Sequence, residues 1–116
     1  MAVLRLEQVL AVHPKIRWVG IVGSKRVLLC EMRPGVKSLT PEEEDRMMLE
    51  LQAPFHTEMA NRRMKWIGPV DFAMVSYEAF YELHVPLGEN LLVVTIEKDV
   101  AFTDIPEIAR TIKGLS

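Results

Sequence analysis

The stretch "LTPEEEDRMMLELQAPFHTEMANRRMKW", residues 39–66, predicts a long helix in the middle of the chain. Thr40 is predicted as the N-cap of this helix, Pro41 as its first helical residue, and Glu43 as the capping-box partner of Thr40. The acidic residues 42–45 then lie at the positive end of the helix dipole, where negative charge is stabilising. The sequence thus predicts where this helix begins.

A proline interrupts the same helix at position 54. Pro54 lacks the N–H that would bond to the carbonyl of residue 50, and its ring clashes with that carbonyl, so the helix must kink or break. We predict a kinked but continuous helix, with two helices and a short joint as the alternative. We expect Met48, Leu51 and Phe55 to face the core. The full apolar stripe, with steps close to four, consists of Met47, Met48, Leu51, Phe55 and Met59.

The residues before the long helix predict a first helix and a hairpin. Apolar residues recur at steps of three and four over residues 2–13, and Pro14 ends this helix. The apolar runs 18–22 and 27–30 flank the sequence "GSKR", residues 23–26, which is typical of a β-hairpin turn.

Three strands and a final helix follow the long helix. Residues 70–77 and 80–86 alternate in polarity, which predicts two strands joined by a tight turn. Residues 91–97, "LLVVTIE", are apolar on both faces, as are residues 18–22, so these two strands are expected at the centre of the sheet. The final helix is predicted to begin near Asp104, with Glu107 as its capping-box partner. Its buried stripe consists of Ile105, Ile108, Ala109, Ile112 and Leu115.

The predicted element order is α-ββ-α-βββ-α. Two strands are apolar on both faces and three are more one-sided or short. A single five-stranded antiparallel sheet covered by helices satisfies this pattern, so we predict an α+β fold.

The length, net charge and apolar runs of the chain limit which partners we expect. Its 116 residues suit one domain, residues 1–116, and its formal net charge of −2 gives no electrostatic reason to expect nucleic acid. A basic cluster at Arg62, Arg63 and Lys65 is interpreted as a solvated helix end that the helix dipole favours. No apolar run approaches the ~20 residues of a membrane span. We therefore expect neither nucleic acid nor a membrane as a partner.

The sequence offers no catalytic or metal-binding motif. Cys30 is the one cysteine, which excludes an internal disulfide and fits a cytoplasmic protein. It lies in an apolar strand without a neighbouring histidine, so we expect a buried structural thiol. Glu82 and His84 share one face of a strand, but two ligands do not make a zinc site, so we expect both at the surface. We predict a protein that is not an enzyme, with no catalytic residue, cofactor or metal.

The chain resembles the Roadblock family, named for a dynein light chain with a profilin-like fold, and small archaeal proteins of unknown function are similar. The resemblance covers nearly the whole chain, although Pro54 and the short first helix depart from it. It implies that the long helix covers one face of the sheet and the other two helices the opposite face. The motifs that carry it are "IRWVGIV" (16–22), "PGVKSLTPEEEDRMM" (34–48), "NRRMKWIGPVDF" (61–72) and "LLVVTIEKDV" (91–100).

The resemblance also implies a homodimer or heterodimer, paired through the long helix and the third strand so that two sheets join edge to edge. The function implied is a non-catalytic interaction or scaffold module, serving as a platform or regulator for a small Ras-like GTPase or a larger scaffold. For Met59 and Met64 two alternatives stay open, a position in the core and a position in the dimer interface. The predicted dimer interface consists of Met59, Met64, Val70, Phe72, Ala73 and Val75.

A small-molecule sensor is the alternative function. Sensory domains of similar layering hold ligands between sheet and helix. The complete apolar pattern of this chain leaves no obvious buried polar group to orient a ligand, which argues against this alternative. The pocket of such a sensor would be lined by Trp18, Trp66, Phe72 and Tyr81.

Overall fold

The computed structural model describes residues 4–23 and 26–115, and it describes the side chains of all of these except residues 53–61. The element order matches the predicted α-ββ-α-βββ-α pattern, with one turn of 3₁₀ helix before the last helix. In chain order the elements are α1 (Leu6–Leu10), β1 (Ile16–Val22), β2 (Val27–Met32), α2 (Glu42–Ile67), β3 (Ala73–Ser76), β4 (Phe80–Leu87), β5 (Asn90–Glu97), η1 (Phe102–Asp104) and α3 (Ile105–Lys113).

The strands form one five-stranded antiparallel sheet in the order β2-β1-β5-β4-β3. Residues 91–96 of β5 are all buried, because this strand has a neighbour on each side and cover on each face. The expectation that the first and fifth strands are central is confirmed. The short strand β3 and the strand β2 form the two edges.

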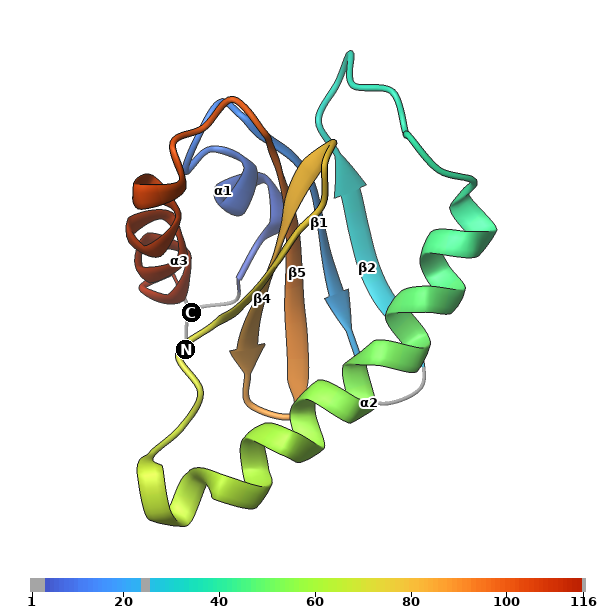
Figure 1. Ribbon diagram of the computed structural model, residues 1–116. Coiled ribbons are helices and arrows are strands. Elements are labelled where there is room, and N and C mark those ends of the chain that lie inside the picture. The colour runs from blue at the N-terminus through green and yellow to red at the C-terminus, as the bar shows by residue number, and fades with distance from the viewer. Residues whose placement is uncertain (1–3, 24–25, 116) are drawn as a thin grey trace.

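Helices cover both faces of the sheet (Figure 1). Successive residues of a strand point to opposite faces, so β5 contributes to two separate clusters. Leu92, Val94 and Ile96 pack under α1 and α3, whereas Leu91 and Val93 pack under α2. The apolar stripe predicted for the last helix is buried at four positions and half-buried at Leu115. The four buried residues are Ile105, Ile108, Ala109 and Ile112.

The long helix α2 continues through position 54 and bends along its length (Figure 1). The prediction of one continuous helix is therefore confirmed for the backbone, and the alternative of two helices with a short joint is not. The predicted capping box is wrong, because α2 begins at Glu42 with Pro41 as its N-cap and without a side-chain cap. The hydroxyl of Thr40 donates instead to the carboxylate of Asp45.

Three other boundaries or caps differ from the sequence prediction. The first helix is short, Leu6–Leu10, and residues 2–3 of its predicted span lie outside the described residues. The predicted capping box of the last helix is not formed, because its N-cap Asp104 makes no side-chain bond. The third strand spans Ala73–Ser76 instead of 70–77. Its register with β4 sets residue 71 opposite Pro86, which has no N–H to continue the ladder.

Candidate protein interaction surface

The described part of the apolar stripe of α2, Met47, Met48 and Leu51, points away from the sheet instead of into the core. Leu49 is 6% exposed and packs with Val22 and Val93, whereas Leu51 is 67% exposed. Each helical residue turns the side chain by about 100°, so residues two positions from Leu49 point roughly to the opposite side. Met47, Met48 and Leu51 are all exposed, and the expectation that Met48 and Leu51 face the core is wrong. Phe55 and Met59 lie outside the described side chains.

This outward stripe was visible in the sequence, but its direction was not. Spacing shows which residues share a face of a helix, whereas the packing of the helix on the sheet decides which face is covered. The stripe gathers exposed apolar side chains on one element, which marks a surface for another molecule. We name Met47, Met48 and Leu51 the outer stripe of α2.

The carboxyl-terminal end of α2 is also exposed. Trp66 and Ile67 are 72% and 75% exposed, and Met64 is exposed as well. The ammonium of Lys65 lies 4.5 Å from the centroid of the Trp66 ring. Gly68 ends the helix with φ = 86°, a conformation that glycine adopts without strain, and its N–H donates to the carbonyl of Met64.

The predicted dimer-interface residues lie at three different places. Met64 is exposed on α2, and Val70 follows the end of that helix half-buried. Phe72 packs against the core cluster under α1 and α3, so its ring points away from α2. Ala73 and Val75 lie on the edge strand β3, opposite His84 and Glu82 of β4.

Those two polar residues of β4 form a buried pair. The Nε2 atom of His84 and the Oε2 atom of Glu82 are 2.9 Å apart, and His84 is only 1% exposed. The expectation that both lie at the surface is wrong, because helices cover both faces of the sheet and His84 lies opposite Val93, on the face under α2. Buried polar groups require partners, and this pair satisfies two of them directly beside the edge strand. The period of two along the strand showed that they share a face but not that the face is covered.

Cys30 lies on the opposite edge of the sheet and is exposed. The expectation of a buried thiol is wrong, because β2 has a neighbour only on its β1 side and Leu28, Leu29 and Cys30 are all exposed. Within the part of the chain that the structure describes, no group of three His, Cys, Asp or Glu side chains is arranged to hold a metal.

Two arginines that sequence reasoning missed hold the loops that lead into α2. Arg17 donates to the Glu97 carboxylate at 2.8 Å and to the carbonyl of Lys37 at 2.8 Å. Arg33 donates to the carbonyl of Ile16 at 2.7 Å, and its terminal nitrogen reaches the carbonyls of Leu10 and His13. Guanidinium groups suit this role because they present several donors in a fixed plane. Arg17 lies in the "IRWVGIV" motif, and Arg33 directly precedes the motif that begins at Pro34.

Tyr77 lies in the turn between β3 and β4, where burial and negative charge act on its phenol. Burial raises the pKa of the Tyr77 phenol, and the negative charges of Glu82 and Asp45 raise it further. The charge of Asp45 therefore acts on this turn, although the two lie on different elements. The ammonium of Lys98 donates to the Ser76 hydroxyl and to the Tyr77 carbonyl at 2.5 Å each, which ties the turn to the end of β5.

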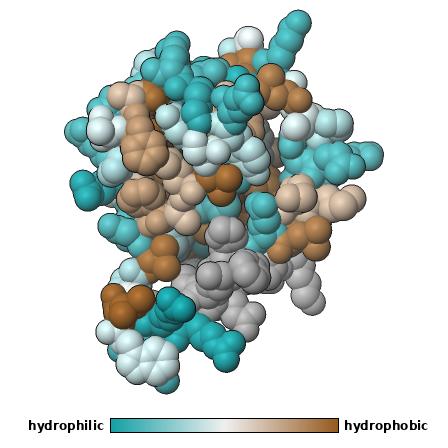
Figure 2. All heavy atoms as spheres, viewed as in Figure 1, coloured by the Kyte–Doolittle hydropathy of each residue, from teal (hydrophilic) through white to brown (hydrophobic). Residues whose placement is uncertain are grey.

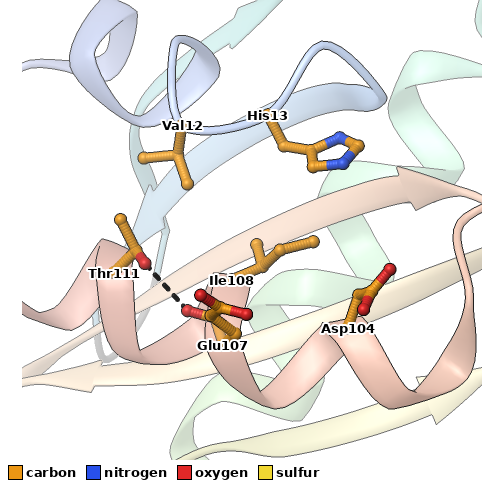
Figure 3. Close-up of a pocket in the computed structure, with 6 residues that line it drawn as sticks. All are labelled: Val12, His13, Asp104, Glu107, Ile108 and Thr111. Atoms are coloured by element: carbon orange, nitrogen blue, oxygen red, sulfur yellow. Dashed lines mark hydrogen bonds between the residues drawn. The ribbon is translucent and has the colours of Figure 1, made fainter.

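A pocket of about 360 Å³ lies between α3 and the loop after α1 (Figure 3). Two of its polar side chains form local hydrogen bonds: His13 Nδ1 accepts from the N–H of Lys15 at 3.0 Å, and Thr111 donates to the carbonyl of Glu107 at 2.9 Å. The pocket lies on the side of the sheet opposite α2. It is lined by Val12, His13, Asp104, Glu107, Ile108 and Thr111.

The four aromatic residues expected to line a sensor pocket do not meet. Trp66 is exposed at the end of α2, whereas Phe72 and Tyr81 pack into the core under α1 and α3. Trp18 lies on the α2 side, where its ring covers Gly20 so closely that a Cβ there would come within 2.3 Å of it. The space beside Gly20 is thus filled by protein.

Comparison of the sequence with protein-family profiles and with curated proteins finds no match. Comparison with solved structures finds chains of the same fold. The gliding protein MglB from Thermus thermophilus is 14% identical with a TM-score of 0.69, covering 95% of this chain and 81% of that chain. MglB in a tetrameric arrangement is 15% identical with a TM-score of 0.65, covering 95% and 83%. A Roadblock/LC7 domain from Streptomyces avermitilis is 11% identical with a TM-score of 0.63, covering 94% and 89%.

Among the described helices, none has a stretch that is both long and apolar enough to cross a bilayer. The sheet order, the position of the long helix on one face and the agreement with these structures lead to one conclusion. The chain has the fold of Roadblock/LC7 domain proteins.

Proposed function

We propose that this chain is a non-catalytic, dimeric interaction module that serves as a platform or regulator for a small Ras-like GTPase. The observation that carries the proposal is the outer stripe of α2, an exposed apolar surface on the longest helix of the fold. Exposed apolar groups gathered on one element favour a protein partner, because water contact with them is unfavourable.

The edge strand β3 supports the dimer. An edge strand presents unpaired backbone donors and acceptors, and a second copy of the same strand satisfies them in an antiparallel pair. Ala73 and Val75 flank that edge, and Met64 and Val70 add apolar surface near the end of α2. MglB, which shares the fold at low identity, forms a tetrameric arrangement, so this architecture is compatible with assembly between copies.

The separation of reactive side chains supports a non-catalytic role. Cys30 lies on β2 and His84 on β4, so three inter-strand steps, roughly 14 Å, lie between their strands. A cysteine nucleophile needs a base within hydrogen-bond reach. His84 is moreover buried against Glu82. These two residues therefore do not form a nucleophile–base pair within one chain.

The proposal divides the surface into two parts that separate variants test. A charge at β3, in Ala73→Arg, is expected to break the dimer, whereas a charge on the outer stripe, in Leu51→Glu, is expected to break the contact with the GTPase. The assay is capture of the purified Ras-like GTPases of the same organism, loaded with GDP or a GTP analogue, by the immobilised protein.

Capture of one GTPase by the native chain, lost in Leu51→Glu, would support the proposal. Ala79→Arg, in the exposed turn between β3 and β4, is the matched control and should leave capture unchanged. Equal capture by the native chain and by Leu51→Glu would contradict the assigned surface. Failure of every GTPase to bind would contradict the GTPase role.

A further inference from the structure

The last two turns of α2 extend beyond the sheet. α2 packs chiefly on β5, β1 and β2, and its carboxyl-terminal end lies past the lower edge of the sheet (Figure 1). All six residues 62–67 are exposed. Trp66 and Ile67 have the largest exposed fractions among the exposed large hydrophobic residues of the described chain. We call residues 62–67 the tip of α2. Figure 2 shows hydrophilic and hydrophobic atoms interleaved at this lower end of the molecule.

The tip carries three positive charges. Arg62, Arg63 and Lys65 are exposed, and none of them takes part in an ion pair among the described residues. Lys65 instead lies against the ring of Trp66, with its ammonium 4.5 Å from the ring centroid. The whole chain has a net charge of −2, so the positive potential is local to the tip.

Cations and apolar side chains surround the end of the helix instead of occupying separate faces. Consecutive residues turn by about 100°, so residues 62–67 cover the whole circumference. Arg62 stands four residues before Trp66 and Arg63 four residues before Ile67, which pairs a cation with an apolar group on two sides. The tip therefore presents positive charge and apolar surface next to each other around the helix.

We infer that the tip of α2 docks on an anionic lipid bilayer surface. Tryptophan prefers the boundary between headgroups and acyl chains, and Ile67 adds apolar area beside it. Arginine and lysine keep their charged ends among anionic headgroups while their stems cover apolar surface. Each basic residue near such a surface strengthens binding roughly fivefold, so three give about a hundredfold or more. This docking is independent of the proposed GTPase role.

The earlier expectation of no membrane partner rested on the missing apolar span and the net charge. Peripheral docking needs neither, because a local cluster attracts headgroups within about one Debye length. Single-stranded nucleic acid fits the tip less well, since its binding sites stack several bases in a groove and Trp66 is the one aromatic residue in the tip.

The test uses the full chain with vesicles of phosphatidylcholine alone and of equal parts phosphatidylcholine and phosphatidylglycerol. Binding is read by co-sedimentation and by tryptophan emission, with Trp66→Phe to assign the signal. We expect binding and a blue shift on the anionic vesicles only, with no blue shift in Trp66→Phe. High salt should release the protein, because screening weakens contacts between exposed charges.

A charge-matched pair of variants gives the sharpest comparison. The double variant Arg62→Gln, Arg63→Gln should lower the partition coefficient on anionic vesicles about 30-fold, because each of the two lost cations contributes roughly fivefold to binding. Arg26→Gln with Lys37→Gln removes two exposed cations elsewhere and should leave it unchanged.

Three outcomes would overturn the inference. The first is equal binding to both vesicle types or to neither. The second is an equal loss in the two double variants, which would reflect net charge instead of the tip. The third is a blue shift of Trp66 that follows protein concentration without vesicles, which would show that the contact between copies proposed at Met64 also covers Trp66.

Discussion

The orientation of α2 can be tested with two leucines that stand two residues apart. Leu49 is 6% exposed and packs with Val22, Leu91 and Val93, whereas Leu51 is 67% exposed on the outer stripe. Both are in the same helix, so Leu→Ala changes helix propensity equally at the two sites. A difference between the two variants therefore reports burial alone.

Leu49→Ala removes a side chain that fills the space under α2. A buried Leu→Ala change costs about 3 kcal/mol of the free energy of unfolding, from lost transfer energy and the cavity left behind. In a domain of this size that cost lowers Tm by roughly 10 °C. Leu51→Ala at an exposed position is expected to change the free energy of unfolding by less than about 0.5 kcal/mol.

The assay is urea unfolding followed by circular dichroism, with each variant measured at low and high protein concentration. Equal losses for the two variants, or a larger loss for Leu51→Ala at low concentration, would show that α2 is turned the other way. A loss for Leu51→Ala that grows with protein concentration would place Leu51 in the contact between copies.

Three further outcomes follow from side-chain contacts. Arg17→Met should lower the free energy of unfolding by about 2 kcal/mol in urea titrations, because it leaves the Glu97 carboxylate and the Lys37 carbonyl without their donor. The hydrogen bond and positive charge of Lys113 lower the pKa of Asp71 below its ordinary value of 3.8. The ion pair of Asp71 with Lys113 therefore stabilises the fold above pH 3.8, and this stabilisation is lost as the pH falls below 3.8. In a plot of Tm against pH, Lys113→Met should flatten the acid limb. Native Cys30 should react with a thiol reagent at nearly the rate of the unfolded chain, since it is exposed; strong protection would contradict that position.

The sequence predicted the elements whose signal lies in their own periodicity. Residues 91–97 are apolar at every position but two, and this two-sided pattern placed β5 at the centre of the sheet. The stripe of α3 likewise predicted its buried face, because a helix with one apolar face has only one way to cover it.

The sequence did not predict which face of α2 is covered. The helix has apolar residues on more than one side, Leu49 toward the sheet and Leu51 away from it, and the described members of the predicted stripe, Met47, Met48 and Leu51, are exposed. The prediction that Glu82 and His84 are exposed was wrong for a related reason. Their polarity indicated exposure to solvent, but both are buried as a hydrogen-bonded pair on the face of the sheet under α2.

The capping prediction failed because α2 begins one residue later than predicted, at Glu42 instead of Pro41. Thr40 donates to the carboxylate of Asp45 instead of capping the helix, and Pro41 takes the N-cap position. Local motifs list the bonds that a side chain is able to make, whereas the path of the loop decides which bond forms.

The measurement that tests the central claim most directly is the molar mass in solution by light scattering over a range of concentrations. We expect twice the 13.2 kDa of one chain for the native protein and the mass of one chain for Ala73→Arg and Met64→Glu, with circular dichroism unchanged. Ala79→Arg should keep the native mass. A native protein that stays at the mass of one chain at all concentrations, or variants that keep the native mass, would contradict the proposed dimer.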